Sequence, residues 1–363
     1  MAMRMPHKNK KLHIVHIIPT LRHGGAERLV VDLSNALAKN GHRVSIVTFF
    51  DDIPLASELD KNVEVHIVKK KGKLSLGLIS ALPKKLLEID ADIVHTHLFG
   101  ADVWGRLAAK KLHLPVVSTE HNINKSEGIL KHQIKRMLRK KTDQYVAVSQ
   151  SVAVYMRERY SIQEDYIDII PPGIDIKKFQ ELSQPEWSDI TSILMLGRLT
   201  EQKGFDIAVK ALAGLQELDW TCQIVGNGEE EQELQRQIRT LGLEERITMS
   251  QATTDVGGVY TSADIVLMPS RWEGFGMVAL EAMAAGRLLI GSRVGGLPDM
   301  IQDKENGVLF EPNNEESLQK ALLWTFDHGD EAKRMARRAK DHVESFDIAH
   351  MVEAYTKIYQ ELV

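Results

Sequence analysis

Residues 193–215, ILMLGRLTEQKGFDIAVKALAGL, contain an apolar run, a turn with a glycine at each end, and an amphipathic stretch. The run 193–196 is short and apolar, which predicts a buried strand, and residues 205–215 repeat apolar side chains at helical spacing. The same order occurs near the start of the chain, where His23-Gly24-Gly25-Ala26 follows the apolar run 12–18. We therefore expect two halves that each begin with a strand, a glycine turn and a helix.

Apolar runs and amphipathic stretches alternate along most of the chain, which predicts parallel sheets with helices on both faces. The predicted strands are residues 12–18, 43–49, 63–68, 92–97, 116–120, 145–148, 193–196, 223–225, 247–249, 265–268 and 288–290. The predicted helices are residues 26–39, 76–89, 102–111, 129–141, 151–160, 205–215, 229–240, 278–285, 315–326 and 348–362. The expected fold class is α/β, with two Rossmann-like domains that face each other across a cleft.

The length of 363 residues favours two domains over one core. Pro171-Pro172-Gly173 breaks the alternation, so we place an interdomain linker at residues 172–189. The expected N-terminal domain is 1–171 and the expected C-terminal domain is 190–346. Residues 347–363 are expected to form a terminal helix that packs back toward the N-terminal domain.

The net charge of −4 conceals an asymmetry between the two halves. Residues 1–175 carry 27 Lys and Arg against 19 Asp and Glu, a net charge of +8, whereas residues 176–363 carry a net charge of −12. A basic half indicates an anionic partner, with drift in composition between the two domains as the alternative. No nucleic-acid partner is expected.

The composition also bears on the cellular compartment. The single cysteine, Cys222, allows no intramolecular disulfide and suits a reducing environment. The first apolar run is short and contains His13 and His16, so it does not resemble a signal peptide. No run approaches the roughly 18 apolar residues of a spanning helix. We expect a cytoplasmic protein that is soluble or rests on a membrane surface.

Two glycine turns are candidate anion sites. Gly24-Gly25 opens a helix whose N-terminal N–H groups and dipole attract an oxyanion, although a plain tight turn is the alternative. Arg198 and Lys203 flank the corresponding turn in the second half, and two cations at a strand–helix turn suit a diphosphate. The alternative for each cation is a solvated surface charge.

The segment Glu273-Gly-Phe-Gly-Met-Val-Ala-Leu-Glu281 is the most informative in the chain. It follows the strand predicted at 265–268, and its ionised carboxylates are acceptors suited to vicinal hydroxyls. Gly274 and Gly276 allow a ligand to approach backbone N–H groups. Two structural carboxylates in a surface turn are the alternative, but the apolar neighbours of Glu281 place it close to a buried helix face.

His121 ends the strand predicted at 116–120, and strand ends in α/β sheets point at the ligand cleft. It could hydrogen-bond a sugar hydroxyl or stabilise charge near a phosphate, and a satisfied structural histidine is the alternative. His95 and His97 end another strand and resemble a metal-binding pair. No further Cys, His, Asp or Glu spacing supports a metal, so we expect no metal site.

Taken together, these residues show that the whole chain resembles the retaining glycosyltransferases of family four, which have the two-Rossmann GT-B architecture. The matching pieces occur in the family's order and cover roughly residues 12–310. They are Gly24-Gly25-Ala26-Glu27-Arg28, His121, Pro172-Gly173-Ile174-Asp175, Gly197-Arg198, Lys203-Gly204, Gly226-Asn227-Gly228, Glu273 with Glu281, and Gly295-Gly296.

The resemblance assigns roles to these residues. It implies that Arg198 and Lys203 bind the donor diphosphate with the Gly25 backbone N–H, and that Glu281 holds the ribose. Glu273 would contact the donor sugar, and His121 would lie beside its anomeric centre. The further donor-binding residues implied are Gly226, Asn227, Gly274, Phe275, Gly276 and Met277.

The same resemblance implies catalysis by His121, Glu273, Arg198 and Lys203 without a metal or another cofactor. The donor is expected to be a nucleotide sugar, with a UDP-sugar favoured over a GDP-sugar. The chemistry implied is front-face displacement with retention, in which the diphosphate helps to accept the acceptor's proton. The N-terminal domain would lie on the acceptor side and the C-terminal domain would bind the donor.

The sequence departs from the family pattern at two places, and two other functions are alternatives to glycosyl transfer. Met249-Ser250-Gln251 replaces a turn that often carries glycine, which leaves the base contacts open, and Asp299 stands where glutamate is common. A non-hydrolysing sugar-nucleotide epimerase shares the two-domain fold, but we identify no ionisable groups for its elimination step. A catalytically silent nucleotide-sugar-binding protein would not need the set Arg198, Lys203, Glu273 and Glu281.

The segment between Ile129 and Lys141 predicts a basic amphipathic helix. Its expected apolar stripe is Leu130, Ile134, Met137 and Leu138, and its basic rows contain Lys131, Lys135, Arg136, Arg139 and Lys140. Such a helix favours an anionic membrane surface, with an ordinary core-facing helix as the alternative, and Lys69, Lys70, Lys71 and Lys73 add a second basic cluster. We therefore expect peripheral association with the inner face of the cell membrane, and a lipid-linked acceptor such as a polyprenyl-diphosphate sugar in bacterial surface-polysaccharide assembly.

Overall fold

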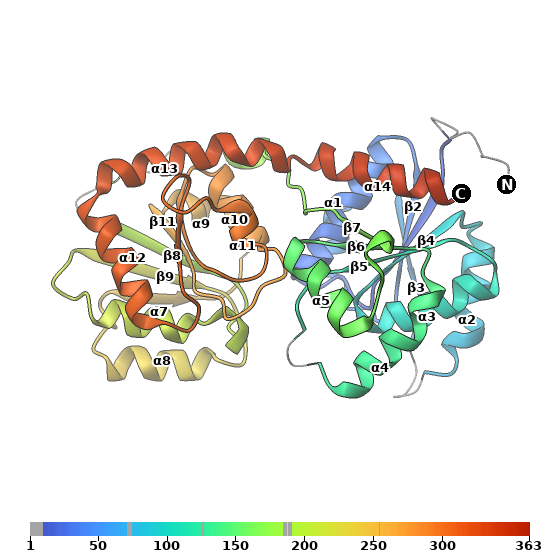
Figure 1. The fold of residues 1–363 in the computed structure, drawn as a ribbon, viewed down its shortest axis with the longest axis horizontal. Helices are drawn as coiled ribbons and strands as arrows, with labels where there is room; N and C mark the ends of the chain where they lie inside the picture. Colours follow the sequence, from blue (N-terminus) through green and yellow to red (C-terminus); the bar gives the residue numbers. More distant parts are fainter. Residues whose placement is uncertain (1–9, 71–74, 125–126, 184–186, 188–190, 254) are drawn as a thin grey trace. The chain divides into compact units, whose positions relative to one another are not determined.

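The chain forms two compact units in the computed structural model (Figure 1). The structure describes residues 10–70, 75–124, 127–183, 187, 191–253 and 255–363. The first unit comprises Met1–Gly173 with Ile348–Val363, and the second comprises Ile174–Asp347. The stretch 172–189 is therefore divided between the units, and the short helix α6 (Lys177–Gln180) belongs to the second.

In the part of the chain that the structure describes, the first unit is built on a seven-stranded parallel sheet in the order β3-β2-β1-β4-β5-β6-β7. Its strands are β1 (His13–Ile17), β2 (Arg43–Thr48), β3 (Val63–Ile67), β4 (Ile93–His97), β5 (Val116–Glu120), β6 (Gln144–Ala147) and β7 (Ile167–Ile169). Its helices are α1 (Gly25–Lys39), α2 (Leu78–Glu88), α3 (Leu98–Lys111), α4 (Ile129–Leu138), α5 (Gln150–Tyr160) and α14 (Ile348–Leu362).

The two faces of this sheet carry different chemistry because strand side chains alternate. Val15, Ile17 and Val94 pack with α2 and α3 in an apolar core. The alternate residues His16 and His95 point to the opposite face, where the end of the chain covers them. There α14 packs beside α1.

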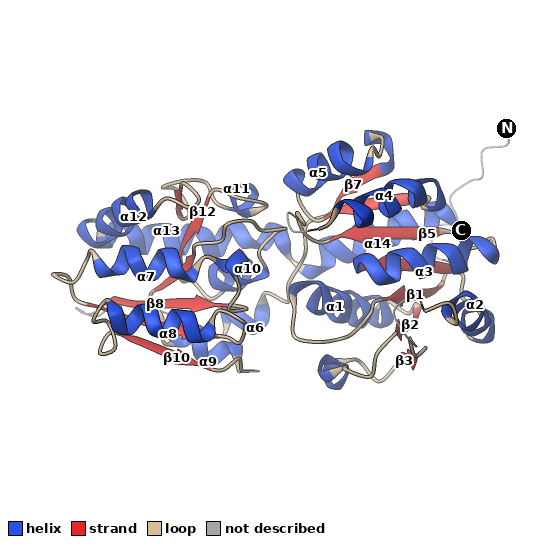
Figure 2. Ribbon diagram, turned by 90° about the horizontal axis from the view of Figure 1, so that it is seen from below, coloured by secondary structure: helices blue, strands red, loops and turns tan. Residues whose placement is uncertain are grey.

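The second unit repeats this architecture with a six-stranded parallel sheet, among described residues, in the order β10-β9-β8-β11-β12-β13 (Figure 2). Its strands are β8 (Thr191–Leu196), β9 (Trp220–Val225), β10 (Ile247–Ser250), β11 (Ile265–Met268), β12 (Leu288–Ser292) and β13 (Val308–Phe310). Its remaining helices are α7 (Phe205–Ala213), α8 (Glu231–Thr240), α9 (Val256–Thr261), α10 (Met277–Ala284), α11 (Leu297–Met300), α12 (Glu315–Asp327) and α13 (Gly329–His342).

Several elements differ from the sequence prediction. β7 and β13 were not predicted because three residues are too few to establish a strand pattern. α13 was missed because its buried face consists of Ala332, Met335, Ala336 and Ala339, whose small side chains give a weak hydrophobic signal. α3 begins at Leu98, directly after β4, rather than at residue 102.

Strand order reverses at one point in each sheet, and such points are where open α/β sheets bind ligands. In the first unit the reversal lies between β1 and β4, and in the second it lies between β8 and β11. The glycine turns at residues 24–25 and 197–204 follow β1 and β8, so each stands beside a reversal. None of the helices in the described residues is long and apolar enough to cross a membrane.

Candidate active site

The most clearly assembled part of the site is an ion pair at the strand reversal of the second unit. Lys203 lies in a single 3-10 turn after β8, and Glu273 lies in the loop after β11. The Lys203 Nζ atom is 2.6 Å from Glu273 Oε2, and both side chains are largely buried, at 14% and 11% exposure. Ser270 Oγ also donates to Glu273 Oε2, at 3.2 Å. Two predicted catalytic residues, 70 positions apart, are thus in direct contact.

The two loops that carry this pair are joined at several further points. Arg271 donates to both carboxylate oxygens of Asp206, at 2.7 and 2.8 Å. Gly204 has φ +64, and a Cβ there would lie 2.1 Å from the carbonyl oxygen of Pro269. Only glycine fits so close to the neighbouring backbone in this left-handed conformation. The geometry of the ion pair is therefore fixed by its supporting loops.

Glu281 projects from α10 and is held by a buried tyrosine. The hydroxyl of Tyr260, on α9, donates to Glu281 Oε2 at 2.8 Å. Burial, together with the adjacent Glu281 carboxylate, raises the pKa of Tyr260 well above its ordinary value. The tyrosine therefore stays protonated, and its hydroxyl helps to orient the Glu281 carboxylate.

The glycine-rich segment between the two glutamates shapes the backbone around them. Gly276 has φ +107 and caps α10, which begins at Met277, while Phe275 is buried. Gly295 has φ +58, and a Cβ there would lie 2.1 Å from the carbonyl oxygen of Glu273. The Gly296 N–H donates to the carbonyl oxygen of Gly274 at 3.1 Å. The predicted Gly295-Gly296 motif thus supports the loop that carries Glu273.

Arg198, Gly226 and Asn227 border the same strand ends. A Cβ on Gly226 would lie 1.8 Å from the carbonyl oxygen of Gly197, so the loops after β8 and β9 touch through bare backbone. Asn227 accepts from the Leu199 N–H at 2.9 Å through its backbone and from the Ala252 N–H at 2.8 Å through its side chain. Arg198 is exposed beside these loops, where its guanidinium can reach an anion.

In the first unit, the predicted site residues are Gly25 and His121. Gly25 is the first residue of α1, and the helix N-terminus provides N–H groups at the end of β1. His121 follows β5 directly and is partly exposed. Burial lowers the pKa of His121 to about 4, against an opposing effect of Asp102. Its imidazole is therefore neutral at physiological pH.

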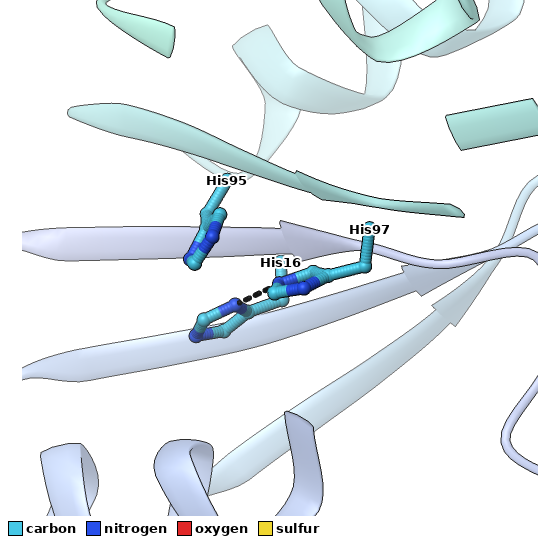
Figure 3. A group of neighbouring side chains, drawn as sticks. All are labelled: His16, His95 and His97. Atoms are coloured by element: carbon cyan, nitrogen blue, oxygen red, sulfur yellow. Dashed lines mark hydrogen bonds between the residues drawn. The ribbon is translucent and has the colours of Figure 1, made fainter. Parts of the chain in front are cut away.

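The sheet joins His121 to two histidines that the sequence analysis did not connect with it. His121 Nε2 lies 3.0 Å from His97 Nδ1, and His97 Nε2 lies 3.0 Å from His16 Nδ1. Figure 3 shows His16, from β1, in hydrogen-bond contact with His97 at the end of β4. The three side chains form a continuous hydrogen-bonded row across β1, β4 and the end of β5.

Contrary to the sequence prediction, the pair His95 and His97 has a third neighbouring candidate ligand, because His16 joins them from the adjacent strand. One nitrogen of each of these three histidines lies within 4.8 Å of the others. However, both nitrogens of His97 are bonded to histidines, and both nitrogens of His95 are bonded to Tyr359 and Thr119 hydroxyls. All three are fully buried and the group contains no carboxylate, so a neutral hydrogen-bonded network fits them better than a divalent cation does.

The structure corrects the predicted surface of α4. Lys135, assigned to an exposed basic row, is buried, and its Nζ atom lies 2.7 Å from Glu120 Oε2 and 3.0 Å from the Tyr160 hydroxyl. Leu130 and Met137, assigned to one apolar stripe, are 68% and 79% exposed. Compared with the predicted orientation, α4 presents Lys135 to the interior, because the buried Glu120 carboxylate requires a cation. The helix ends at Leu138 and continues as a 3-10 turn to Lys141.

Tyr260, Ser270 and His16 are the site residues that sequence reasoning missed. Tyr260 and His16 contact a predicted site residue or its partner from another element, so no local motif identifies either of the two, whereas Ser270 lies three residues before Glu273 in the same loop. A signal existed only for His16, which is a polar residue within the apolar strand His13–Ile17.

Comparisons with known proteins identify the family to which the chain is similar. Residues 178–342 match the family described as glycosyl transferases group 1, and residues 23–178 match glycosyltransferase family 4. A D-inositol 3-phosphate glycosyltransferase of Arthrobacter sp. is 28% identical over 364 residues, which cover 89% of this chain and 86% of that protein.

Two solved structures are similar over almost the whole chain. A glycosyltransferase of Rickettsia africae ESF-5 has a TM-score of 0.85 and 26% identity, and the match covers 98% of this chain and 99% of that one. An Anabaena protein solved with UDP-glucose has a TM-score of 0.86 and 21% identity, with 97% and 100% covered. Both family models together span residues 23–342, and the chain belongs to the group 1, family 4 glycosyltransferases.

Proposed function

We propose that this protein transfers a sugar from a nucleoside-diphosphate sugar to an acceptor with retention of anomeric configuration, and that the second unit holds the donor. The observation that carries the proposal is the preassembled pair Lys203–Glu273 at the strand reversal of the second sheet, with Glu281 on the helix that follows. The Lys203 ammonium would contact the diphosphate, the Glu273 carboxylate would contact the sugar, and the Glu281 carboxylate would contact the ribose.

The donor diphosphate would be held by Arg198 and Lys203. Arg198 is exposed, so it can close onto phosphate oxygens, whereas Lys203 is already fixed by Glu273. The Lys203 ammonium would donate both to Glu273 and to phosphate oxygens. Its N–H donors would stabilise the negative charge that grows on the phosphate as the sugar–phosphate bond breaks. Protein cations then supply this stabilisation without a divalent metal.

Glu281 and Glu273 would divide the remaining contacts. Glu281 accepts from the Tyr260 hydroxyl, and its carboxylate suits the two vicinal hydroxyls of a ribose. Glu273 lies among the backbone groups of residues 274–276, where it would accept from donor-sugar hydroxyls. Its pairing with Lys203 links recognition of the sugar to the position of the diphosphate.

The transfer step is a displacement on one face of the sugar. The bond from the anomeric carbon to the diphosphate oxygen breaks and its electron pair stays on the phosphate. The acceptor oxygen bonds to the anomeric carbon from the same face, and its proton passes to the departing phosphate oxygen. By the resemblance to the family, His121 would hydrogen-bond the sugar near this carbon. A UDP-sugar is the favoured donor because the similar Anabaena structure contains UDP-glucose.

We further propose that the acceptor is lipid-linked and that α4 rests on the cytoplasmic face of an anionic membrane. Ile129, Leu130 and Met137 are 77%, 68% and 79% exposed on α4. The exposed cations beside them are Lys131, Arg136, Lys140 and Lys141. Apolar side chains flanked by cations complement a layer of acyl chains under anionic headgroups. Of the second predicted basic cluster, Lys71 and Lys73 lie outside the described residues.

Incubation with UDP-, GDP- and ADP-sugars tests the proposal. Release of nucleoside diphosphate that increases with a polyprenyl-diphosphate sugar supports a lipid-linked acceptor, whereas an increase only with a soluble acceptor such as D-inositol 3-phosphate contradicts that part. Conversion of the donor sugar without net release of nucleoside diphosphate indicates an epimerase. Thermal stabilisation by a donor with no chemical change indicates a silent binding protein.

A further inference from the structure

The row of histidines in the first unit constrains where each ring carries its proton. The row runs from His16 through His97 to His121, with 3.0 Å between the joined nitrogens at each step. His16 and His97 are fully buried. Burial lowers the pKa of His16 to about 3 and that of His97 well below its ordinary value, so these rings are neutral and each carries one N–H.

Two neutral states satisfy both hydrogen bonds. If His97 donates from Nε2 to His16, then His121 must donate from Nε2 to His97, and all three rings carry the proton on Nε2. If His97 donates from Nδ1 to His121, then His16 donates from Nδ1 to His97, and all three carry it on Nδ1. A mixed arrangement would place two protons or none in one of the N···N contacts.

The inner end of the row favours one of these states. His16 Nε2 is buried and has no hydrogen-bond partner among the described residues. In the first state this atom would be a buried N–H without an acceptor, and such orphaned donors are rare in folded proteins. In the second state His16 Nε2 is an unprotonated ring nitrogen, so no buried N–H lacks an acceptor at the inner end of the row. His121 then carries its proton on Nδ1, at the outer end of the row.

We propose that His97 and His16 are positioning residues that hold His121 in the Nδ1–H tautomer, so that His121 presents a fixed hydrogen-bond donor to its ligand. Among the described residues, the inner end has no partner to receive a proton, so the row fixes a tautomer and does not conduct protons. The inference rests on the proposed function only in placing His121 beside the donor sugar. There the N–H would donate to a hydroxyl or phosphate oxygen, and His121 would not act as a base.

His95 provides a matched comparison within the same strand. It is fully buried on the same face, and its ring centroid lies 4.0 Å from that of His97. Its nitrogens bond to the hydroxyls of Tyr359 and Thr119, so it takes no part in the row. His97→Phe and His95→Phe therefore make the same change in size and polarity, but only His97→Phe breaks the contact with His121.

The test is the tautomer of His121 in the ligand-free protein, read from long-range proton–nitrogen NMR spectra and assigned with His121→Gln. We expect the Nδ1–H form in wild type and in His95→Phe, and a mixture of forms in His97→Phe. His97→Asn should restore the Nδ1–H form, because its amide N–H can replace the Nδ1–H donor. An Nε2–H form in wild type, or an unchanged tautomer in His97→Phe, would overturn the proposal.

Kinetics supply a second readout. For histidines that bind metals, removal of a group that fixes the ring typically costs about 10- to 100-fold, and we expect a comparable loss for His121. His97→Phe should lower kcat/KM by that range while His95→Phe stays near wild type, and His121→Phe should cost less in the His97→Phe background than in wild type. Equal losses in His97→Phe and His95→Phe would contradict a positioning role. If the wild-type protein turns over no nucleotide sugar, the proposed function fails while the tautomer measurement still stands.

Discussion

At the scale of single residues, Lys203 and Arg198 differ in burial, so their effects on donor binding and on the free energy of unfolding can be measured separately. Lys203 is largely buried against Glu273, whereas Arg198 is exposed at the end of β8. Removing Lys203 leaves a largely buried carboxylate without its cation, and removing Arg198 does not. The two cations therefore have the same proposed role toward the donor but different roles in the folded protein.

We expect Arg198→Ala and Lys203→Ala each to lower kcat/KM by roughly 100- to 1000-fold, because each removes a donor aimed at developing charge. Only Lys203→Ala should also lower the free energy of unfolding, by about 1–3 kcal/mol, since Glu273 loses a hydrogen-bonded partner. Steady-state kinetics and urea denaturation measure the two effects. Activity within threefold of wild type for both variants would contradict the assignment.

The two glutamates should separate nucleotide binding from turnover. Glu281→Gln should weaken binding of the free nucleoside diphosphate, because ribose contacts persist without the sugar. Glu273→Gln should leave that affinity near wild type and reduce turnover. Titration calorimetry with UDP measures the first effect and steady-state rates the second. Equal losses of UDP affinity in both variants would be inconsistent with this division of roles.

Tyr260 gives a prediction for a residue that touches no substrate in the proposal. Tyr260→Phe removes the hydroxyl that donates to Glu281 and preserves the ring. It should weaken UDP binding by less than Glu281→Gln does, because the carboxylate remains and loses only the hydrogen bond from Tyr260. A loss of UDP affinity as large as that of Glu281→Gln would instead indicate a collapse of the site.

The residues that could be predicted from the sequence are those whose role has a local cause. Gly276 and Gly295 adopt positive φ values in turns, and such positions appear in the sequence as glycine. Tyr260 and His16 could not be predicted, because their roles arise from contacts with Glu281, 21 residues away, and with His97, 81 residues away. The pairing of strands and helices creates these contacts, and no short motif contains them.

At the scale of elements, α4 shows how a buried charge decides the orientation of a helix. Periodicity grouped the apolar residues of this segment in one stripe and assigned Lys135 to an adjacent basic row, but the ion pair with Glu120 turns Lys135 inward. Periodicity could not anticipate this because Glu120 lies on a different element, at the end of β5. The outcome leaves apolar residues and cations together on the exposed surface of α4.

Replacement of Lys131, Arg136, Lys140 and Lys141 by Gln should abolish sedimentation with anionic vesicles at low salt and leave UDP binding intact. Each basic residue near an anionic surface contributes about 1 kcal/mol, so four can hold the protein reversibly. The control replaces four exposed cations of the second unit, namely Lys210, Arg236, Lys320 and Arg337. If wild type does not sediment at any ionic strength, or if the control set removes binding equally, α4 is not the membrane contact.

At the scale of the whole molecule, the buried histidines make the stability of the first unit depend on pH. Burial lowers the pKa of His16 to about 3 and of His121 to about 4, and it lowers the pKa values of His95 and His97 well below their ordinary values. Below about pH 6.5 the unfolded chain binds protons that the folded unit does not. Stability is therefore present above pH 6.5 and is lost as the pH falls toward the folded-state pKa values.

Urea denaturation between pH 7.5 and 5 measures this dependence. Each such histidine should contribute a slope of roughly 1.4 kcal/mol per pH unit once the unfolded form is protonated. His95→Phe removes one of them, so its slope should be smaller by about that amount. A slope that is the same in wild type and His95→Phe would show that His95 is not held neutral in the folded protein.

The sequence predicted the repeated α/β architecture because each half contains several strand–helix units with strong apolar runs. It did not predict β13 or α13, whose patterns are short or built on alanine. The assembly of the donor residues at one strand reversal follows from the sheet order, which brings β8 beside β11. The sequence alone could suggest that order only through the resemblance to family four.

The central claim is that the strand reversal of the second unit binds a nucleoside diphosphate through Lys203 and Arg198, and calorimetric titration with UDP in the presence of EDTA tests it most directly. Hydrogen bonds to charged groups are worth about 1.5–3 kcal/mol, so each alanine variant should raise the Kd for UDP by roughly 10- to 150-fold. Lys210→Ala, which removes an exposed lysine of α7, should leave the Kd unchanged. Metal-independent binding that both site variants weaken and Lys210→Ala does not is the predicted result. A Kd for UDP that neither Arg198→Ala nor Lys203→Ala alters would contradict the claim.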